Sequence, residues 1–322
     1  ELGLWADFII VAPATANTLS KMANGHADSF LIATYLSAKC PVFIAPAMDL
    51  DMYKHGSTQD NLSKLSERGN HIIYPESGEL ASGLVGEGRL AEPENIISFI
   101  ENYYSKKCTL YGKNILITAG PTFEPIDPVR FIGNHSSGKM GLAIVNEALE
   151  RGASVTLIHG PISLSIPSGI KKVIGVNSAN EMFELCKEHY EKQDIVIMSA
   201  AVADYTPVTI SDQKIKKSEA NWTIELTKTV DILKWMGQHK KHQVLVGFAL
   251  ETENELNNAQ QKLKNKNLDF IVLNSLRNEG AGFKTATNKI TLVHSNNKIT
   301  NFELKSKELV AKDIIDSIEK YF

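Results

Sequence analysis

The sequence predicts an α/β protein made of two doubly wound, three-layer domains. Short apolar runs alternate with amphipathic helical patterns along the whole chain, which is typical of parallel sheets covered by helices. The 322 residues are many for one hydrophobic core and suit two. The polar stretch "NYYSKKCTLYGK" (102–113) interrupts the alternation. We therefore expect one domain over residues 1–106 and a second over residues 107–322.

The composition is that of an ordinary globular protein. Apolar residues make up 43% and charged residues 22% of the chain, and the formal net charge of -3 indicates no nucleic-acid-binding surface. Cys40, Cys108 and Cys186 are widely spaced, so neither a disulfide framework nor a zinc site is implied. No apolar run is long enough to span a bilayer. We expect a cytoplasmic protein that binds neither membranes nor nucleic acids.

The first domain begins at a predicted buried strand. Its strands are expected at residues 7–13, 41–46 and 71–75. Its helices are expected at residues 16–37, 58–68 and 93–104. The opening "ELGLWADFIIVAPATANT" has no lead-in to its first strand, which suggests that an earlier part of the domain is absent from the chain.

The second domain restarts the alternation with "NILITAG" (114–120). Further strand-like runs lie at residues 154–160, 194–205, 222–228, 243–252 and 269–274. Helices are expected at residues 138–151, 179–190 and 306–321. Two alternating runs, 289–295 and 298–304, are separated by Asn296 and Asn297 and predict an antiparallel hairpin. Because ligands bind beyond the carboxyl ends of strands in doubly wound sheets, the loops directly after the strands are the candidate site.

The loop after residue 120 is unusually long for a strand-to-helix connection, and long loops in compact domains are often functional. It carries polar groups suited to binding a carboxylate or phosphate at a helix N-terminus, namely Arg130, Asn134, His135 and Lys139. The alternative for Arg130 is a simple ion pair with Glu124 or Asp127. Both interpretations of Arg130 stay open on the sequence alone.

The end of this loop, "GNHSSGKM" (133–140), matches a phosphate-binding P-loop except at its last position. A P-loop needs Ser or Thr there to hold Mg²⁺, and the thioether of Met140 cannot do so. A P-loop also follows its strand directly, whereas this motif begins about a dozen residues after the nearest predicted strand. We therefore expect a different anion-binding use of the same loop.

Two further loops have compatible chemistry. Asp204 follows the small residues after the strand at 194–198, and a lysine group beginning at Lys214 lies beyond it. After the strand at 243–249, Lys262 and Lys266 are four residues apart and so project from one helix face. Three such loops at strand ends predict one site for a phosphate-rich ligand. A lysine run on its own is more often a solvated surface.

These motifs together resemble the phosphopantothenate-cysteine ligase half of the bifunctional coenzyme A biosynthesis proteins. The segments that carry the resemblance are "ITAGPTFEPIDPVRFIGNHSSGKMG", "SAAVADY", "KIKK", "VGFALET" and "KNKNLD". The resemblance implies a Rossmann-like domain that uses CTP, with Mg²⁺, to activate the carboxylate of 4'-phosphopantothenate as an acyl-cytidylate. The amino group of cysteine then attacks the acyl group.

The resemblance also implies roles for individual residues. Asn134 would stabilise the acyl-cytidylate, Arg130 would lie beside it, and Lys214 would contact the triphosphate. The remaining CTP contacts would be Met198, Ser199, Ala200, Asp204, Val230, Asp231, Ile232, Leu233, Phe248, Lys262 and Lys266.

The first domain resembles the flavodoxin-like, FMN-dependent phosphopantothenoylcysteine decarboxylase half, through "APATANT", "APAMDLDMY" and "SGELASGLVGEGRL". This implies flavin or substrate contacts at Pro13, Thr15 and Asn17. It implies decarboxylase-substrate contacts at Met48 and Asp49. In the family, ligase dimers and decarboxylase trimers combine in one homo-oligomer.

Three departures from the decarboxylase pattern are expected to matter. The family's first flavin-binding strand and catalytic histidine would lie upstream of residue 1, so we expect this chain not to retain FMN. Asp49 replaces an asparagine that would meet the substrate carboxylate, and a carboxylate there would repel it. Ser82 replaces a loop cysteine, and a hydroxyl is a poorer proton donor than a thiol.

Two other function classes remain as alternatives. One is a non-catalytic nucleotide- or flavin-binding module, which would have no need of Asn134. The other is a dehydrogenase, which is disfavoured because no G-x-G-x-x-G follows any predicted strand.

Overall fold

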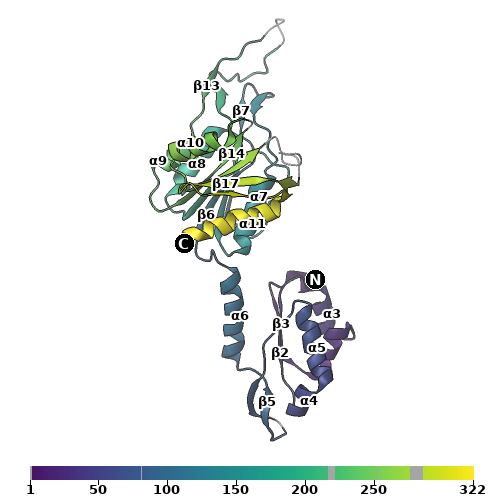
Figure 1. Cartoon of the computed structure of the whole chain (residues 1–322). Coiled ribbons are helices and arrows are strands. Elements are labelled where there is room, and N and C mark those ends of the chain that lie inside the picture. Colours follow the sequence, from purple (N-terminus) through teal and green to yellow (C-terminus); the bar gives the residue numbers. More distant parts are fainter. Residues whose placement is uncertain (1, 81, 217–221, 252, 276–285) are drawn as a thin grey trace. The chain divides into compact units, whose positions relative to one another are not determined.

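The computed structural model describes residues 2–80, 82–216, 222–251, 253–275 and 286–322. The chain forms two compact units, Glu1–Lys106 (unit 1) and Lys107–Phe322 (unit 2). Both are α/β units, as the alternation of apolar runs and helical patterns predicts (Figure 1).

Unit 1 has a parallel sheet covered on both faces. The strands are, in spatial order, β1 (Ile9–Ala14), β2 (Val42–Pro46) and β3 (His71–Ile72). One face is covered by α2 (Ala16–Asn24), α3 (Phe30–Ser37) and α5 (Gly56–Glu67), and the other by α6 (Pro93–Lys107). The unit also contains α1 (Leu2–Trp5), α4 (Leu50–Lys54) and an antiparallel pair, β4 (Glu76–Glu79) with β5 (Val85–Arg89).

The single helix expected at residues 16–37 was wrong, because two local signals divide it. Gly25 closes α2 in the left-handed conformation, with φ of 72°. Ser29 then begins α3 as its N-cap, and its hydroxyl accepts a hydrogen bond from the amide of Ile32. The pair β4–β5 was missed, because its glycine-rich sequence lacks the alternation of a half-buried strand.

Unit 2 contains a sheet of eight strands in the order β10-β9-β6-β11-β14-β15-β17-β18. Their bounds are β6 (Asn114–Ala119), β9 (Ser154–His159), β10 (Lys172–Gly175), β11 (Ile195–Met198), β14 (Val244–Glu251), β15 (Phe270–Ser275), β17 (Ile290–His294) and β18 (Ile299–Asn301). The first six are parallel, and β17–β18 is the predicted antiparallel hairpin with Asn297 at its turn.

The order of the parallel strands fixes where a ligand can bind. The chain runs outward from β6 through β9 to β10, and then returns to β11 on the other side of β6. The order therefore reverses between β6 and β11, and in doubly wound sheets the crevice at that reversal is the binding site.

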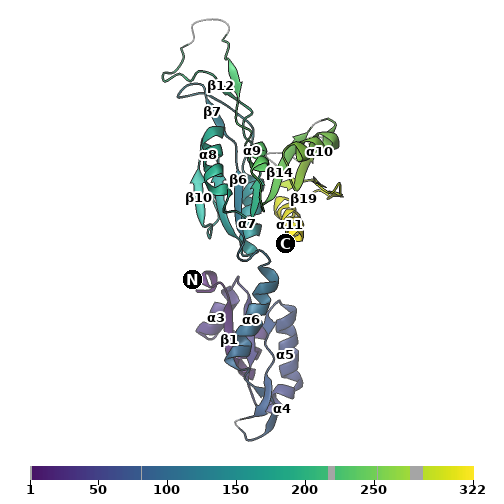
Figure 2. The same ribbon diagram turned by 90° about the vertical axis from the view of Figure 1, so that its left-hand side faces the viewer.

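Alternate side chains of the strands support two helical layers. Ile117 and Ile197 face α7 (Lys139–Glu150) and α11 (Lys307–Ile318), which pack side by side. Leu116 and Val196 face the other layer. That layer contains α8 (Ala179–Tyr190), α9 (Ile232–Gln238) and α10 (Glu255–Asn265) (Figures 1 and 2). Because successive side chains of a strand point to opposite faces of the sheet, each face has its own hydrophobic core.

Three short antiparallel pairs complete unit 2, together with a closing 3₁₀ turn, Glu319–Tyr321. They are β7 (Phe123–Pro125) with β8 (Phe131–Gly133), β12 (Tyr205–Pro207) with β13 (Leu226–Lys228), and β16 (Thr287–Asn288) with β19 (Lys305–Ser306). The pairs β7–β8 and β12–β13 contact each other beyond the main sheet (Figure 2). The strands expected at 194–205 and 222–228 are shorter than predicted, because β11 ends at Met198 and β13 begins at Leu226.

Candidate active site

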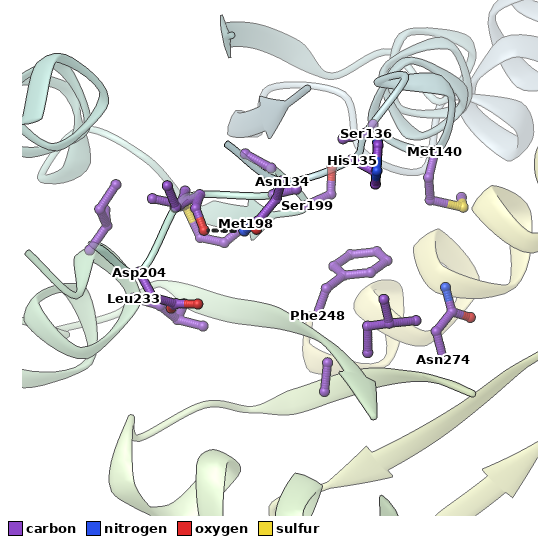
Figure 3. Close-up of a pocket in the computed structure, with 18 of the residues that line it drawn as sticks. Asn134, His135, Ser136, Met140, Met198, Ser199, Asp204, Leu233, Phe248 and Asn274 are labelled. Carbon is purple, nitrogen blue, oxygen red and sulfur yellow. Dashed lines mark hydrogen bonds between the residues drawn. The ribbon is translucent and has the colours of Figure 1, made fainter. Parts of the chain in front are cut away.

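A cavity of about 900 Å³ opens at the carboxyl ends of the central strands of unit 2. The loops after β6 and β11 contribute to its wall, and so do the carboxyl end of β14 and the lysines of α10, so all three predicted segments reach the cavity. Figure 3 shows Asp204 and Leu233 at one end, Met140 and Asn274 at the other, and Phe248 between them. The cavity is thus long enough to bind an extended ligand across the crevice.

The hairpin β7–β8 places Asn134 in the cavity wall. The rings of Phe123 and Phe131 stack at 3.9 Å across the hairpin, and Asn134 follows β8 directly. Its side-chain amide donates a hydrogen bond to the carbonyl of Val202, at 2.9 Å (Figure 3). Asn134 therefore joins the loop after β6 to the loop after β11.

Two buried threonines fix the loop after β11. The Thr118 hydroxyl accepts from the amide of Ala200 at 3.2 Å, and its carbonyl accepts from the Ser199 hydroxyl at 2.6 Å. The hydroxyl of Thr122 accepts from the amide of Ala203 at 2.9 Å. The loop is thus held against β6, and its small side chains leave the main chain accessible to a ligand.

Helix α10 supplies positive charge. The Lys262 ammonium donates to the carbonyl of Phe248 at 3.0 Å, and Lys266 forms an ion pair with Asp231 at 2.8 Å. Burial lowers the pKa of Lys262, and the neighbouring charge of Lys266 lowers it further. Asp231 also caps α9 through the amide of Lys234. An anion bound here would relieve the repulsion between the two ammonium groups.

The N-terminus of α7 also lines the cavity. Gly138 occupies the N-cap position in the left-handed conformation, with φ of 75°, and no side chain caps the helix. Lys139 begins the helix and lies in the cavity wall. The "SSGKMG" segment therefore contributes a helix N-terminus without a side-chain cap and a cation, both of which favour an anion.

The sequence analysis missed several residues of this cavity, including Lys228, Asn274, Asn288 and Lys307. Asn274 lies near the carboxyl end of β15, and the strand-end rule should have found it. Lys307 is 5% exposed and begins α11, where the helix dipole disfavours a cation, which was a usable signal. Burial lowers its pKa, and the charge of Lys139 adds to the effect.

The structure brings together most of the residues predicted for the nucleotide. In the wall are Asn134, Met198, Ser199, Ala200, Asp204, Val230, Asp231, Ile232, Leu233, Phe248, Lys262 and Lys266. Arg130 and Lys214 are not among the described residues that line it. Arg130 forms an ion pair with Asp127, which was one of the two alternatives. Glu124, the other possible partner, accepts from the amide of Ala179. Lys214 is exposed to solvent.

The residues predicted in unit 1 lie at one edge of its sheet. The register pairs Ala14 with Pro46, so the loops after β1 and β2 emerge together. Pro13 lies near the end of β1, Thr15 is the N-cap of α2 and Asn17 lies in its first turn, while Met48 and Asp49 follow β2.

The two residues that depart from the family pattern, Asp49 and Ser82, contact each other. Asp49 caps α4 by accepting from the amide of Leu50 at 2.7 Å. The same carboxylate oxygen accepts from the Ser82 hydroxyl at 2.9 Å. Asp49 and Ser82 thus form a local pair at the open edge of unit 1.

Neither a metal cluster nor a membrane-spanning helix occurs in the described part of the chain. Among the described residues, no three His, Cys, Asp or Glu side chains lie close enough together to hold a metal ion. No helix of the same residues has the length and apolar character needed to cross a bilayer.

Comparison with known proteins identifies both units. The family model "Flavoprotein" matches residues 1–105, and the model "DNA/pantothenate metabolism flavoprotein C-terminal domain" matches residues 110–322. The chain is 55% identical over 323 residues to a cysteine/cysteine sulfinic acid decarboxylase from an unknown prokaryotic organism, covering 99% of this chain and 90% of that protein. It is 48% identical over 316 residues to the coenzyme A biosynthesis bifunctional protein CoaBC of Bacillus subtilis (strain 168), covering 98% of this chain and 78% of that protein.

Solved structures agree with these matches. The crystal structure of the C-terminal domain of a coenzyme A biosynthesis bifunctional protein CoaBC aligns with a TM-score of 0.57 at 42% identity, covering 66% of this chain and 96% of that chain. A pantothenate-metabolism flavoprotein from Streptococcus pneumoniae, at 24% identity and a TM-score of 0.58, shares the fold and covers 66% of this chain and all of that chain. The chain belongs to the family of bifunctional coenzyme A biosynthesis proteins.

Proposed function

We propose that unit 2 ligates 4'-phosphopantothenate to cysteine and that CTP drives the reaction. The observation that carries this proposal is the cavity, in which the Asn134 amide, the Lys262 and Lys266 ammonium groups and the N-terminus of α7 line one crevice. Such an arrangement suits a nucleotide triphosphate at one end and a second anionic substrate beside it. The membership of the family supports the same reaction.

The first step is the attack of a substrate carboxylate oxygen on the α-phosphorus of the nucleotide. A bond forms between that oxygen and phosphorus, the bond to the β-phosphate oxygen breaks, and pyrophosphate leaves. Lys262 and Lys266 would stabilise the charge that develops on the phosphates, and Lys266 would exchange its Asp231 partner for a phosphate oxygen. Phe248 and Leu233 would enclose the nucleoside, because they form the apolar wall of the cavity.

The second step is aminolysis of the acyl-nucleotide. The cysteine amino group adds to the acyl carbon, the carbon-oxygen bond to the nucleotide phosphate breaks, CMP leaves, and the nitrogen loses a proton. The amide of Asn134 would donate to the acyl oxygen, where negative charge develops. Because this amide already spans two loops through Val202, it would be positioned before the reaction begins. We treat Mg²⁺ as part of the nucleotide substrate.

The test of this proposal is a nucleotide panel. The purified chain is incubated with 4'-phosphopantothenate, cysteine and CTP, ATP, GTP or UTP, and pyrophosphate and the amide product are measured. We expect both products with CTP, in equal amounts and only when 4'-phosphopantothenate and cysteine are present. Absence of product with every nucleotide would refute the ligase proposal.

For unit 1 we propose an FMN-dependent decarboxylase site at the edge formed by the loops after β1 and β2. The exposed Thr15 hydroxyl and Asn17 amide lie at the start of α2, and this donor set fits the polar groups of FMN. Bound FMN would supply the oxidation of a substrate thiol. Pro13 would contact the flavin and Met48 the substrate.

The Asp49–Ser82 pair favours a second candidate substrate for unit 1. Asp49 is held by the Leu50 amide and the Ser82 hydroxyl, and a carboxylate attracts an ammonium group. Free cysteine and cysteine sulfinic acid carry such a group, and the 55% identical relative bears their names. The test is CO₂ release from these amino acids and from phosphopantothenoylcysteine by the purified protein with FMN added. Preference for the free amino acids, reversed by Asp49→Asn, supports this candidate; release from phosphopantothenoylcysteine alone excludes it.

A further inference from the structure

The turn between β7 and β8 contains a buried carboxylate with five hydrogen bonds. One oxygen of Asp127 accepts from the amides of Val129 and Arg130, both at 2.9 Å. The other accepts from Nε of Arg130 at 2.9 Å, from Nη2 of the same guanidinium, and from the amide of Ile215 at 3.2 Å. The Asp127 side chain has no exposed surface. The Arg130 guanidinium keeps the pKa of this carboxyl far below its usual range, so Asp127 is ionised throughout the physiological range.

Arg130 extends the contact to the same distant residue. Its Nη2 donates to the carbonyl of Ile215 at 2.9 Å, so the ion pair binds both main-chain groups of Ile215. The guanidinium also lies 4.5 Å from the ring centroid of Trp222. Nearby, the amide of Ser211 donates to the carbonyl of Ile126 at 3.0 Å. We call the contact of Asp127 and Arg130 with Ile215 the Asp127 clamp.

The clamp joins the hairpin that carries Asn134 to a distant segment rich in lysine. On one side, β8 leads from Arg130 directly to Asn134 in the cavity wall. On the other side, Ile215 lies between Lys214 and Lys216, and we call residues 214–216 the lysine segment. An ion pair that served only the local turn would not require both main-chain groups of a residue 88 positions away. The clamp therefore sets the main-chain position of the lysine segment relative to the hairpin of Asn134.

We propose that Asp127 is a positioning residue of the ligase reaction, which acts by fixing the main chain of Ile215 and thereby the place of Lys214. This inference rests on the proposed function and on the triphosphate contact that the family resemblance implies for Lys214, which is exposed and is not among the described residues that line the cavity. Arg130 takes part through the clamp. Its guanidinium is committed to Asp127, Ile215 and Trp222, and it is not among the described residues that line the cavity.

A double-mutant cycle tests the proposal. Asp127→Asn removes the negative charge and keeps the shape of the side chain, and Lys214→Met removes the cation that the clamp is proposed to place. Pyrophosphate release then gives kcat and the nucleotide KM for the full chain, the two single variants and the double variant. We expect about a 10- to 100-fold loss of kcat/KM for CTP in each single variant, the range that a small misplacement of a reacting group produces. The double variant should be no slower than Lys214→Met alone, because the clamp acts through that lysine.

The matched control is Asp269→Asn. Asp269 also accepts from a cation, Lys240 at 2.6 Å, and from a main-chain amide, that of Leu245 at 2.7 Å, but it does not line the cavity. This variant should lower the unfolding midpoint and leave both kinetic constants within about twofold of the parent. Arg130→Lys perturbs the clamp from its partly exposed side and replaces Asp127→Asn in the cycle if that variant fails to fold.

Losses that multiply in the double variant would overturn the inference, as would parent kinetics in both Asp127→Asn and Arg130→Lys. If the parent chain is inactive with every nucleotide, the proposed function itself is refuted, and the proposed role of the clamp is refuted with it.

Discussion

Replacement of Lys262 by Met should weaken nucleotide use strongly and selectively. Lys262 lies on α10 in the cavity wall, where burial has already lowered its pKa and where its ammonium donates to the carbonyl of Phe248. Methionine preserves most of the apolar stem and removes only the charge and the donor. The variant therefore isolates the contribution of one cation to binding a polyanion.

The magnitude follows from the partial burial of this lysine. A charge-assisted hydrogen bond to a phosphate contributes about 1.5–3 kcal/mol, and we take about 2 kcal/mol for a site that still touches solvent. That energy corresponds to about a 30-fold increase in the nucleotide KM. The KM values of the pantothenate substrate and of cysteine should change by less than about threefold.

The assay is steady-state pyrophosphate release with each substrate varied in turn. Lys264→Met is the matched control, because Lys264 is exposed on the same helix and does not line the cavity. Its constants should stay within about twofold of the parent. Equal effects of the two substitutions, or a Lys262→Met effect confined to the pantothenate substrate, would refute the placement of the triphosphate beside α10.

Two further predictions follow from the same cavity. Burial and the charge of Lys266 lower the pKa of Lys262, so its ammonium loses a proton at a lower pH than an ordinary lysine with a pKa of 10.5. The nucleotide KM should therefore rise at alkaline pH. If Lys262→Met shows the same rise, the rise does not come from deprotonation of Lys262. Gly138→Ala places a methyl group 2.7 Å from Cγ2 of Ile162 at φ of 75°, whereas Gly169→Ala, at φ of 86°, meets no atom within 4 Å. Gly169→Ala should lose about 1–2 kcal/mol of unfolding free energy in chemical denaturation, and Gly138→Ala should lose more because of the contact with Ile162. Only Gly138→Ala should also raise the nucleotide KM, and equal KM values in the two variants would show that the N-terminus of α7 does not bind the nucleotide.

The sequence was sufficient for the parts of the fold that depend on local pattern. Buried parallel strands such as β6 and β11 are short apolar runs, and the β17–β18 hairpin has its turn at Asn297, so both could be predicted. The strand-end rule then placed the loops of Asn134 and Asp204 at one crevice, because parallel strands end at one edge of the sheet.

Contacts between distant segments could not be predicted in this way. The sequence left two acidic partners open for Arg130, Glu124 and Asp127, and only the folded hairpin decides for Asp127. The contact of Asp127 with Ile215 joins residues 88 positions apart. Because Ile215 takes part through its main chain, neither the charge pattern nor the periodicity of the sequence indicates this contact. The burial of Lys307 depends in the same way on how α11 packs against α7.

The most direct test of the proposed ligase site is the substitution Asn134→Asp, with CTP binding and product formation measured on the same preparation. The substitution keeps the size of the side chain and replaces the amide donor by a carboxylate next to the developing oxyanion. We expect CTP to bind with an affinity within a few-fold of the parent, and product formation to fall about 100- to 1000-fold, as when one oxyanion donor is lost. Product formation at the parent rate would contradict the proposed ligase site, because the reaction would then not need the amide of Asn134.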